Sequence, residues 1–379
     1  MDNLAHSLVG LAAAKAGCEK LSPGATAVCL LAANAPDADV VILLFADRWS
    51  FLHYHRHITH SIIGTLVIAL LLPLIFWLGD RGLARLRSRA PRVRLKGLVL
   101  VSLIVSATHP FLDWTNNYGV RLLLPWSGKW FYGDLVFIID PFIWLVLGSA
   151  VFLLTAKRKW QVIAWSLLAI VLTYFVMTTS AERGLTNATL VKVVWVAVIT
   201  VLVLAHRLGA AARWGPRLAQ AAFAILVIYW TGLGVLHSRA LKEVNFAAAS
   251  IARERSETVT DFAAMPTLAN PFYWQAVAET DRAAYRFDVS LTDDIRYPNS
   301  IVRHERADTM SSPFLLSAAR DRRTRIFLGF ARFPVYRVAA ADCLSETVVQ
   351  LADLRYTQPG TARGSFALEV PVTCPLQSE

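Results

Sequence analysis

A histidine and an aspartate four residues apart are the side chains of this sequence best suited to chemistry. His109 and Asp113 stand in the run His-Pro-Phe-Leu-Asp, at the end of an apolar stretch that starts near Gly97. Because residues at i and i+4 lie on one face of a helix, an imidazole and a carboxylate placed in this way can bind one divalent cation. The simpler alternative is a hydrogen bond between the two side chains that fixes the end of the helix.

Further imidazoles and carboxylates occur in the first 140 residues. They are His53, His55, His57 and His60 in the run His-Tyr-His-Arg-His-Ile-Thr-His, together with Asp37, Asp39, Asp134 and Asp140. Such groups suit zinc, manganese or iron, and metals held by them activate water for attack on a phosphoryl or acyl group. Each histidine of the run could instead belong to a solvated turn, and the first two aspartates to a turn after Pro36. Asp140 before Pro141 could simply begin a helix.

The composition indicates a membrane protein with several spans. Of the 379 residues 55% are hydrophobic and 17% charged, and the mean hydropathy is +0.46. Such values are typical of chains that cross a bilayer repeatedly. The predicted spans are 61–79, 97–112, 135–156, 161–180, 190–206 and 218–237. After about residue 240 charges return and apolar residues alternate with polar ones, which predicts a water-soluble domain.

The net charge of +11 comes from the membrane half of the chain. Residues 238–379 contain 17 basic and 17 acidic side chains, which leaves 21 of the 38 basic and 10 of the 27 acidic ones for the membrane half. Seven basic residues lie in Arg81–Lys96 and three in Lys157–Lys159, whereas the loops 113–134 and 182–189 hold three between them. Basic loops are cytoplasmic in inner-membrane proteins. With no basic face in the soluble domain, nucleic acid is not an expected partner.

This topology puts the candidate groups on one side of the membrane. The histidine run, the His109–Asp113 pair and the C-terminal domain should all be outside, although the topology was assigned from lysines and arginines alone. The segment 25–46 is apolar but interrupted by Asn34, Pro36 and two aspartates, so we expect it to be non-crossing or re-entrant. With helix 3–17 along the outer surface, His6 could then join the site. Residues 1–3 lack the basic start of a cleavable signal peptide.

The four cysteines fall into two pairs. Cys18 and Cys29 lie in the N-terminal segment, and Cys343 and Cys374 in the predicted soluble domain. Because disulfides persist outside the cytoplasm, we predict a Cys343–Cys374 bridge, with two buried thiols as the alternative.

Short motifs follow one another through about residues 1–145. They are Met1-Asp2, His6 and Gly10, Asn34-x-Pro36-Asp37-x-Asp39, His55-Arg56-x-x-Thr59-His60-Ser61, His109-x-x-x-Asp113, Asn116-x-Tyr118-Gly119, Pro125-Trp126-Ser127, Asp134 and Phe137-Ile138-Ile139-Asp140-Pro141. In these motifs and their order, the N-terminal part resembles the membrane-bound metal-dependent hydrolases of the YdjM-like kind.

That family is similar, more distantly, to zinc-dependent phospholipases C and single-strand-specific nucleases, which are helical and bind three zinc ions. The resemblance implies metal ligands at His6, Asp37 or Asp39, His60, His109 and Asp113. Those enzymes have further histidine ligands downstream, but this sequence has no histidine between His109 and His206. The site should therefore hold fewer metals or use His55, Asp134 and Asp140. The chain also begins Met1-Asp2, where those enzymes use an N-terminal tryptophan.

The soluble domain has the pattern of a β-rich fold. A helix is expected at 240–260 and an aromatic turn at 270–274, and strands at 285–291, 326–330, 335–339, 348–351 and 366–370.

We therefore expect an α-helical polytopic membrane protein with a C-terminal soluble β-rich (α+β) domain. Its parts are a metal-dependent hydrolase-like membrane domain (1–145), additional transmembrane helices (146–237) and a soluble extracytoplasmic domain (238–379). The expected function is an inner-membrane hydrolase that cleaves a phosphodiester or other ester bond in a lipid or envelope substrate with metal-activated water. The alternative is a non-enzymatic scaffold or regulator with a structural metal site. A third reading is a metal or proton carrier. It would need polar residues deep in several spans, and Asp140 is the only candidate.

The expected cofactor is a divalent metal, zinc before manganese or iron, and the expected partner is membrane lipid. The expected metal ligands are His6, Asp39, His55, His60, His109 and Asp113. The expected catalytic carboxylates are Asp37, Asp39 and Asp140.

Overall fold

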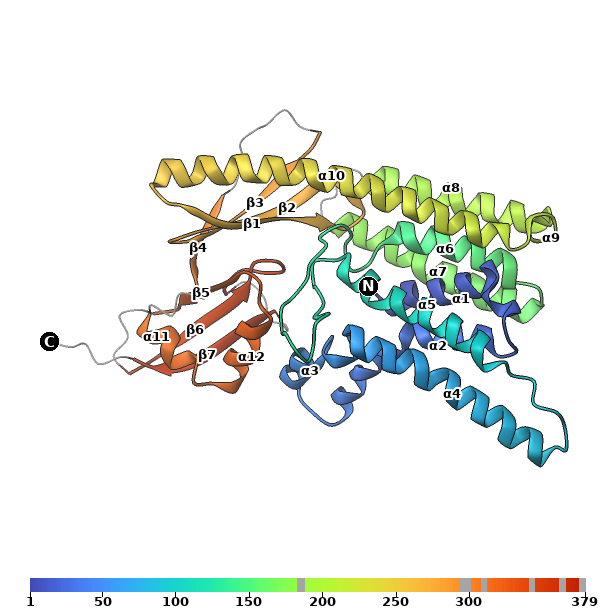
Figure 1. The fold of residues 1–379 in the computed structure, drawn as a ribbon. Helices are drawn as coiled ribbons and strands as arrows, with labels where there is room; N and C mark the ends of the chain where they lie inside the picture. Colours follow the sequence, from blue (N-terminus) through green and yellow to red (C-terminus); the bar gives the residue numbers. More distant parts are fainter. Residues whose placement is uncertain (183–187, 293–300, 308–311, 341–344, 361–365, 375–379) are drawn as a thin grey trace. The chain divides into compact units, whose positions relative to one another are not determined.

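Membrane helices and an antiparallel sheet make up the two units of this chain (Figure 1). The structure, a computed structural model, describes residues 1–182, 188–292, 301–307, 312–340, 345–360 and 366–374. The first unit consists of Met1–Ala38, Arg56–Gly234 and Leu268–Asn270. The second consists of Asp39–His55, Val235–Thr267 and Pro271–Glu379.

Six helical segments of the described residues are long and apolar enough to cross a membrane. They are Ala25–Leu44, Ile62–Leu86 (α4), Leu95–Trp114 (α5), Lys159–Thr178 within α7 (Lys159–Glu182), Thr189–Arg207 within α8 (Ala188–Arg207) and Arg217–Arg255 (α10). The remaining helices of this part are α6 (Pro141–Thr155) and the short α9 (Ala210–Trp214). Ala25–Leu44 is among them, although we expected the segment 25–46 to be non-crossing or re-entrant. The chain is a multi-pass membrane protein, as its composition indicates.

The predicted span 135–156 is shorter in the structure than the sequence suggested. Its helix, α6, begins at Pro141, and residues 135–140 precede it as a loop. Asp140 caps the helix, because its side chain accepts hydrogen bonds from the backbone N–H groups of Phe142 and Ile143 at 2.8 and 3.3 Å. The capping alternative for Asp140-Pro141 is therefore the observed one. With 15 residues, α6 falls short of the roughly 20 that a helix needs to cross.

A close-packed hairpin precedes these helices. It consists of α1 (Asn3–Ala16) and α2 (Ala25–Asn34), and α2 continues into the 3-10 segment η2 (Ala35–Leu44). Small residues permit the close approach, since a Cβ on Gly10 would lie 2.6 Å from the carbonyl oxygen of Cys29. Between the two helices, η1 (Cys18–Lys20) follows the turn at Gly17.

The hairpin runs along the length of α5. Near the start of α5, a Cβ on Gly97 would collide with the carbonyl oxygen of Leu21. Near its end, His109 Nδ1 lies 2.6 Å from the carbonyl oxygen of Ala33. Helix α1 is thus packed among α2, α5 and α6 and does not lie along an outer surface as expected. The alanine- and glycine-rich face of α1 explains the difference, because it allows the helix to be buried lengthwise.

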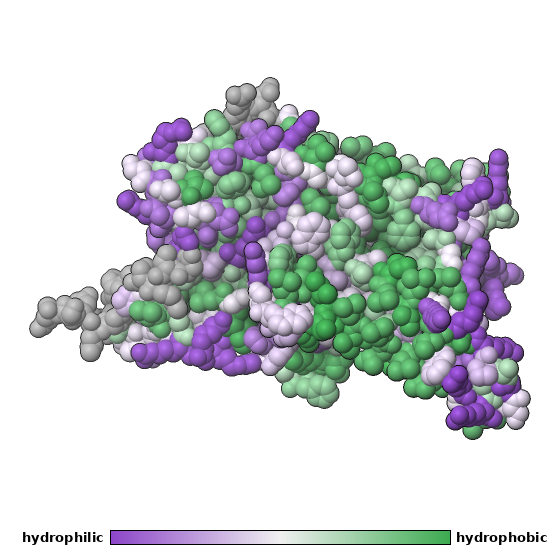
Figure 2. Space-filling view, in the orientation of Figure 1, coloured by the Kyte–Doolittle hydropathy of each residue, from purple (hydrophilic) through white to green (hydrophobic). Residues whose placement is uncertain are grey.

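The two ends of this helical unit differ in character. At one end, the loop before α5 binds the hairpin turn: the Arg94 guanidinium donates to the carbonyl of Lys20 and its backbone N–H donates to Ser22 Oγ, both at 2.9 Å. This is the end with the basic loops. A broad hydrophobic surface covers the helices between the ends (Figure 2). The opposite end holds the start of α1 and α4 and the end of α2 and α5, and with them the candidate site.

The second unit is built on one sheet with the strand order β1 to β7. The strands are β1 (Val259–Thr267), β2 (Asn270–Thr280), β3 (Ala284–Ser290), β4 (Val302–Arg306), β5 (Pro334–Val338), β6 (Glu346–Asp353) and β7 (Ala367–Thr373), and each neighbouring pair from β2 onward is antiparallel. Its helices are α3 (Arg48–Tyr54), α11 (Pro313–Ala318), α12 (Arg322–Phe330) and the C-terminal half of α10. Val244 and Ile251 of α10 are buried with Trp274, Tyr285 and Phe287 in the core.

Two predicted elements of this unit are wrong. The predicted strand at 326–330 is the end of α12, since Thr324, Phe327 and Phe330 are buried at a spacing of three residues, which is a helical period. Asp321 caps this helix by accepting from the N–H of Arg323. The predicted aromatic turn at 270–274 is the first half of β2, where Trp274 pairs with Val289 of β3.

The described residues include only one of the two cysteines of the predicted disulfide. Cys374 is disulfide-bonded, Cys18 and Cys29 are free, and Cys343 lies outside the described residues.

We expect peptide mapping under non-reducing conditions to find Cys343 linked to Cys374. Alkylation before digestion should label Cys18 and Cys29, and Cys374 should be labelled only after reduction. Alkylated Cys374 in unreduced, freshly purified protein would contradict the bridge.

Candidate metal centre

Three chain segments position four ligand-type side chains in the first unit. Asp37 comes from η2, just after Pro36, and His60 is the last residue of η3 (Ile58–His60). His109 and Asp113 lie on one face in the last turns of α5. The local structure around His60 is tight, because a Cβ on Gly64 would collide with the carbonyl oxygen of Ile58.

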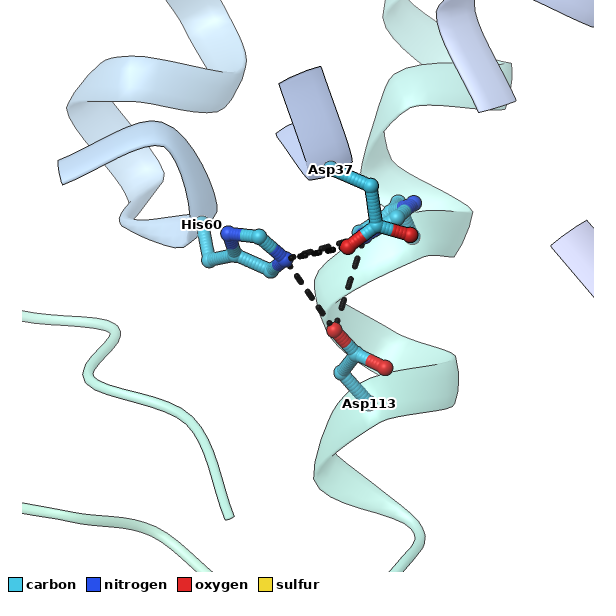
Figure 3. Close-up of side chains that lie close together, drawn as sticks. Asp37, His60 and Asp113 are labelled. Carbon is cyan, nitrogen blue, oxygen red and sulfur yellow. Dashed lines mark hydrogen bonds and ion pairs between the residues drawn. The ribbon is translucent and has the colours of Figure 1, made fainter. Parts of the chain in front are cut away.

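The four side chains converge on a common point. Each offers one ligand atom, and these atoms all lie within 4.8 Å of one another. His60 Nε2 is 3.2 Å from Asp37 Oδ1 and 3.3 Å from Asp113 Oδ2. His109 Nε2 is 3.5 Å from each of the same two oxygens and 3.1 Å from His60 Nε2. Figure 3 shows Asp37, His60 and Asp113 pointing toward one another.

These separations fit a small cation. Ligand atoms that surround a metal tetrahedrally at about 2.0–2.1 Å lie about 3.3 Å from each other. The observed spacings of 3.1–3.5 Å are close to that value. The set contains two imidazoles and two carboxylates, which are ligands that zinc, manganese and iron accept.

The orientation of the rings also favours a cation. A carbonyl oxygen can only accept, so His109 Nδ1 donates to Ala33, and the Nε2 of a neutral ring then presents a lone pair to the cluster. Thr59 Oγ1 lies 3.0 Å from His60 Nδ1 and holds the second ring in a similar way. Ionised carboxylates only accept as well. A divalent ion would satisfy all four groups at once, and partners on the far nitrogen are typical of metal-binding histidines.

His6 from α1 lies directly beside this set. Its ring stacks on that of His109 with centroids 3.8 Å apart, and its Nε2 is 3.5 Å from Asp113 Oδ1. Neither ring nitrogen of His6 has a hydrogen-bond partner among the described residues, although both are buried. Burial lowers the pKa of His6 to about 3, and the nearby His109 adds to this effect. The ring is therefore neutral and has a lone pair available for a cation.

Arg56 supplies the positive charge of the centre. Its Nη2 lies 2.8 Å from Asp113 Oδ1, and the side chain is only 4% exposed. Its Nη1 donates to the carbonyl of Gly119 at 2.9 Å and to Asn116 Oδ1 at 3.3 Å. The guanidinium also lies over the ring of Tyr118, 4.5 Å from its centroid. Arg56 thus fixes both the Asp113 carboxylate and the loop that follows α5.

The other predicted site residues have different surroundings. Asp39 and His55 belong to the second unit and pair with each other, with Oδ1 and Nδ1 3.1 Å apart. Asp140 caps α6 and accepts a hydrogen bond from Tyr229 Oη at 2.8 Å. Burial raises the pKa of Asp140. Asp134 is buried with a left-handed backbone (φ 52°). The structure therefore brings together His6, Asp37, His60, His109 and Asp113 in the first unit, and Asp39 with His55 in the second.

Two supporting residues were missed at the sequence level. Arg56 was noted only as part of a motif, although an arginine among four histidines before an apolar helix was a signal for a buried counter-charge. Asp2 caps α1 by accepting from the N–H of Ala5, and it also accepts from Trp144 Nε1 at 3.0 Å. It thereby joins the start of α1, which carries His6, to α6.

We expect Arg56→Met to destabilise the metal-free protein strongly. The change would leave the Asp113 carboxylate buried without the guanidinium that pairs with it. In comparable buried ion pairs, removal of one partner lowers the free energy of unfolding by about 3–5 kcal/mol. At roughly 2–4 °C per kcal/mol, the unfolding midpoint in detergent should fall by roughly 6 °C or more. Zinc should restore part of this loss, because a cation also offsets the carboxylate. The control is Arg87→Met at an exposed position, which should shift the midpoint little. Equal midpoints for both variants would exclude the proposed role of Arg56.

Comparison with known proteins covers the part of the chain that holds this centre. An uncharacterized protein, YfhP, from Bacillus subtilis (strain 168) is 28% identical over 148 residues, which is 39% of this chain and 42% of that relative. The chain thus matches less than half the length of this relative. No solved structure matches, and nothing in these comparisons supports the expected similarity to zinc-dependent phospholipases C or single-strand-specific nucleases. Residues 1–185, with all five converging side chains, match the family described as YdjM inner membrane protein.

Proposed function

We propose that this chain is a metal-dependent hydrolase of the bacterial inner membrane that cleaves a phosphodiester or other ester bond in a lipid or envelope substrate. The observation that carries the proposal is the convergence of Asp37, His60, His109 and Asp113, whose ligand atoms lie within 4.8 Å of one another. This convergence occurs at the ends of helices that are apolar enough to cross a membrane. A site in that position meets substrates at the level of lipid headgroups.

The residues of the centre would have separate roles. His60 and His109 would hold the ion through Nε2, each ring being kept in place by a contact at Nδ1. When bound, a divalent ion supplies an activated water and neutralises charge that develops on a phosphoryl or acyl group. Zinc fits the ligand set first, and manganese or iron are alternatives. Arg56 balances the charge of Asp113, so the carboxylate keeps its position in the absence of substrate.

Asp37 is the member of the set nearest to solvent. Its side chain is 12% exposed, whereas those of His60, His109 and Asp113 are at most 1% exposed. Asn3 Nδ2 donates to Asp37 Oδ2 at 3.1 Å and orients the carboxylate. We therefore assign to Asp37 the proton-accepting role, in addition to a share in holding the ion. Substrate would approach from its side of the cluster.

The reaction would take place at the outer face of the membrane. The basic loops lie at the end of the helical unit opposite to the centre, and such loops are cytoplasmic in inner-membrane proteins. The disulfide at Cys374 agrees with an extracytoplasmic β-rich domain, since disulfides persist outside the cytoplasm.

A structural metal site is the second candidate function. The near-complete burial of His60, His109 and Asp113 favours it, because structural sites are closed whereas catalytic sites keep one position open. In that case the ion would join η2, η3 and α5, and the chain would act as a membrane scaffold or regulator.

We expect the purified wild-type protein to contain at least one equivalent of zinc, manganese or iron when chelators are avoided. His109→Ala/Asp113→Ala should lose this metal, because two of the four ligands are removed. His53→Ala, at an exposed histidine, serves as the control and should retain it. Elemental analysis of the detergent-solubilised chain measures the ratio. A wild type that stays metal-free after resupply would rule out both candidate functions.

We further expect the metal-loaded protein to hydrolyse bis(p-nitrophenyl) phosphate and phospholipids in mixed micelles. Asp37→Asn should lower kcat by about 100-fold or more, which is the usual effect of losing a positioned acid–base group. The control is Asp288→Asn at an exposed position of β3, for which kcat should be unchanged. A full complement of metal without turnover of any ester would favour the structural site.

A further inference from the structure

The loop that follows α5 contains a closed segment, residues 121–130, which we call the tip loop. Its two ends are joined by the backbone: the N–H of Val120 donates to the carbonyl of Phe131 at 3.0 Å, and the N–H of Phe131 donates back at 2.9 Å. Within the tip loop, the N–H of Trp126 donates to the carbonyl of Leu123 at 3.0 Å. The tip therefore has a turn of defined shape.

This turn exposes large apolar side chains. Trp126 is 77% exposed and Leu123 is 41% exposed, and Pro125 between them is exposed as well. A tryptophan side chain gains more free energy from burial than almost any other, because its apolar surface is large. Neighbouring apolar side chains that remain uncovered within one turn are typical of a surface that a partner covers.

The position of the tip loop identifies the partner as the lipid bilayer. The N–H of Ile62, the first residue of α4, donates to the carbonyl of Leu122 at 3.0 Å, and the two side chains line one apolar hollow with Phe111. Ile62 is 52% exposed and Phe111 is 47% exposed, on helices that are apolar enough to cross a membrane, so lipid covers them. The tip loop continues this lipid-covered surface where α4 begins.

The charge of the tip loop favours the headgroup layer over the hydrocarbon interior. Between Asp113 and Asp134 the sequence contains two basic residues, Arg121 and Lys129, and no acidic residue. Lys129 is exposed, and basic side chains at a membrane surface attract anionic headgroups. Tryptophan is enriched in the same layer, because its ring is apolar and its N–H is polar. An exposed tryptophan beside an excess of positive charge therefore fits the interface between membrane and water.

The base of the tip loop is joined to the metal centre. Arg56 donates to the carbonyl of Gly119 at 2.9 Å, and its other terminal nitrogen lies 2.8 Å from Asp113 Oδ1. On the return side of the loop, the N–H of Gly133 donates to the carbonyl of Trp114 at 2.7 Å. A tip held in the headgroup layer would therefore fix the depth of the metal centre relative to that layer.

We propose that residues 121–130 form an interfacial anchor, in which Leu123 and Trp126 insert into the headgroup layer of the leaflet on the side of the metal centre. Lys129 contacts lipid phosphate groups in the same layer. The anchor does not depend on whether the metal centre is catalytic or structural, because the tip loop takes no part in holding the ion.

The test places a fluorophore at position 126 of the full-length protein in nanodiscs, through Trp126→Cys. A nitroxide on the lipid headgroup should quench this fluorophore at least twofold more strongly than a nitroxide near the end of the acyl chain. Leu70→Cys, at an exposed position two turns into α4, should show the opposite preference. Asp288→Cys, at an exposed position of β3, should be quenched least. Wild-type protein treated with the same reagent corrects for labelling of Cys18 and Cys29, and an unchanged unfolding midpoint shows that each variant is folded.

A fluorophore at position 126 that is quenched no more than the one at position 288 would place the tip in water and overturn the proposal. The quenching preference of position 70 would place the tip in the hydrocarbon and overturn it as well.

The contact of Lys129 with phosphate has its own test. Replacement of phosphatidylcholine by phosphatidylglycerol should raise headgroup quenching at position 126 at least twofold, and Lys129→Gln should remove most of this increase. Lys157→Gln is the matched control, since Lys157 is an exposed lysine of another loop. An increase that persists in Lys129→Gln would exclude the contact.

Discussion

Burial of the Asp113 carboxylate is the constraint on which the site end of the helical unit depends. An unpaired carboxylate is too costly to bury, so surrounding groups must offset its charge. Arg56 does so on one side at 2.8 Å, and the rings of His6, His60 and His109 surround the others. The α-amino group of Met1 also contacts this carboxylate. Segments from three parts of the sequence are thus fixed by one negative charge, and a cation among the remaining lone pairs would complete the balance.

Close helix packing makes this arrangement possible. Gly10 leaves room for the Cys29 carbonyl where α1 meets α2, and Gly97 leaves room for the Leu21 carbonyl where α5 meets the turn of the hairpin. The same contact brings the Ala33 carbonyl to His109, which fixes the ring that carries one of the ligand atoms. The small residues at the helix contacts therefore help to determine where the His109 ring lies at the end of α5.

Much of the centre could be predicted from the sequence because its strongest signals are local. The i, i+4 spacing of His109 and Asp113 needs only a helix, and the topology from basic loops put His60 and Asp37 on the same side. The capping role of Asp140 was available as an alternative because it too is local. The role of Arg56 could not be assigned in this way, because its contact with Asp113 joins residues far apart in the sequence. The β-rich domain shows the same limit. Alternation identified β3, β5, β6 and β7, but an Ile-Phe-Leu-Gly-Phe run reads equally well as a strand, and only the burial of Thr324 and Phe327 shows it to be a helix.

The hydrogen bond between His109 and Ala33 has a consequence for biosynthesis. His109 and Ala33 are 76 positions apart. The contacts of α5 with Asp37 and His60 likewise join it to residues that precede it in the sequence. At about 5–20 residues per second, α5 is synthesised roughly 4–15 s after the hairpin. During that interval α1 and α2 have each other as partners and cannot yet bind α5. Until α5 has been synthesised, the hairpin must therefore be held by contacts between its own helices, such as the close approach of Gly10 to the carbonyl oxygen of Cys29.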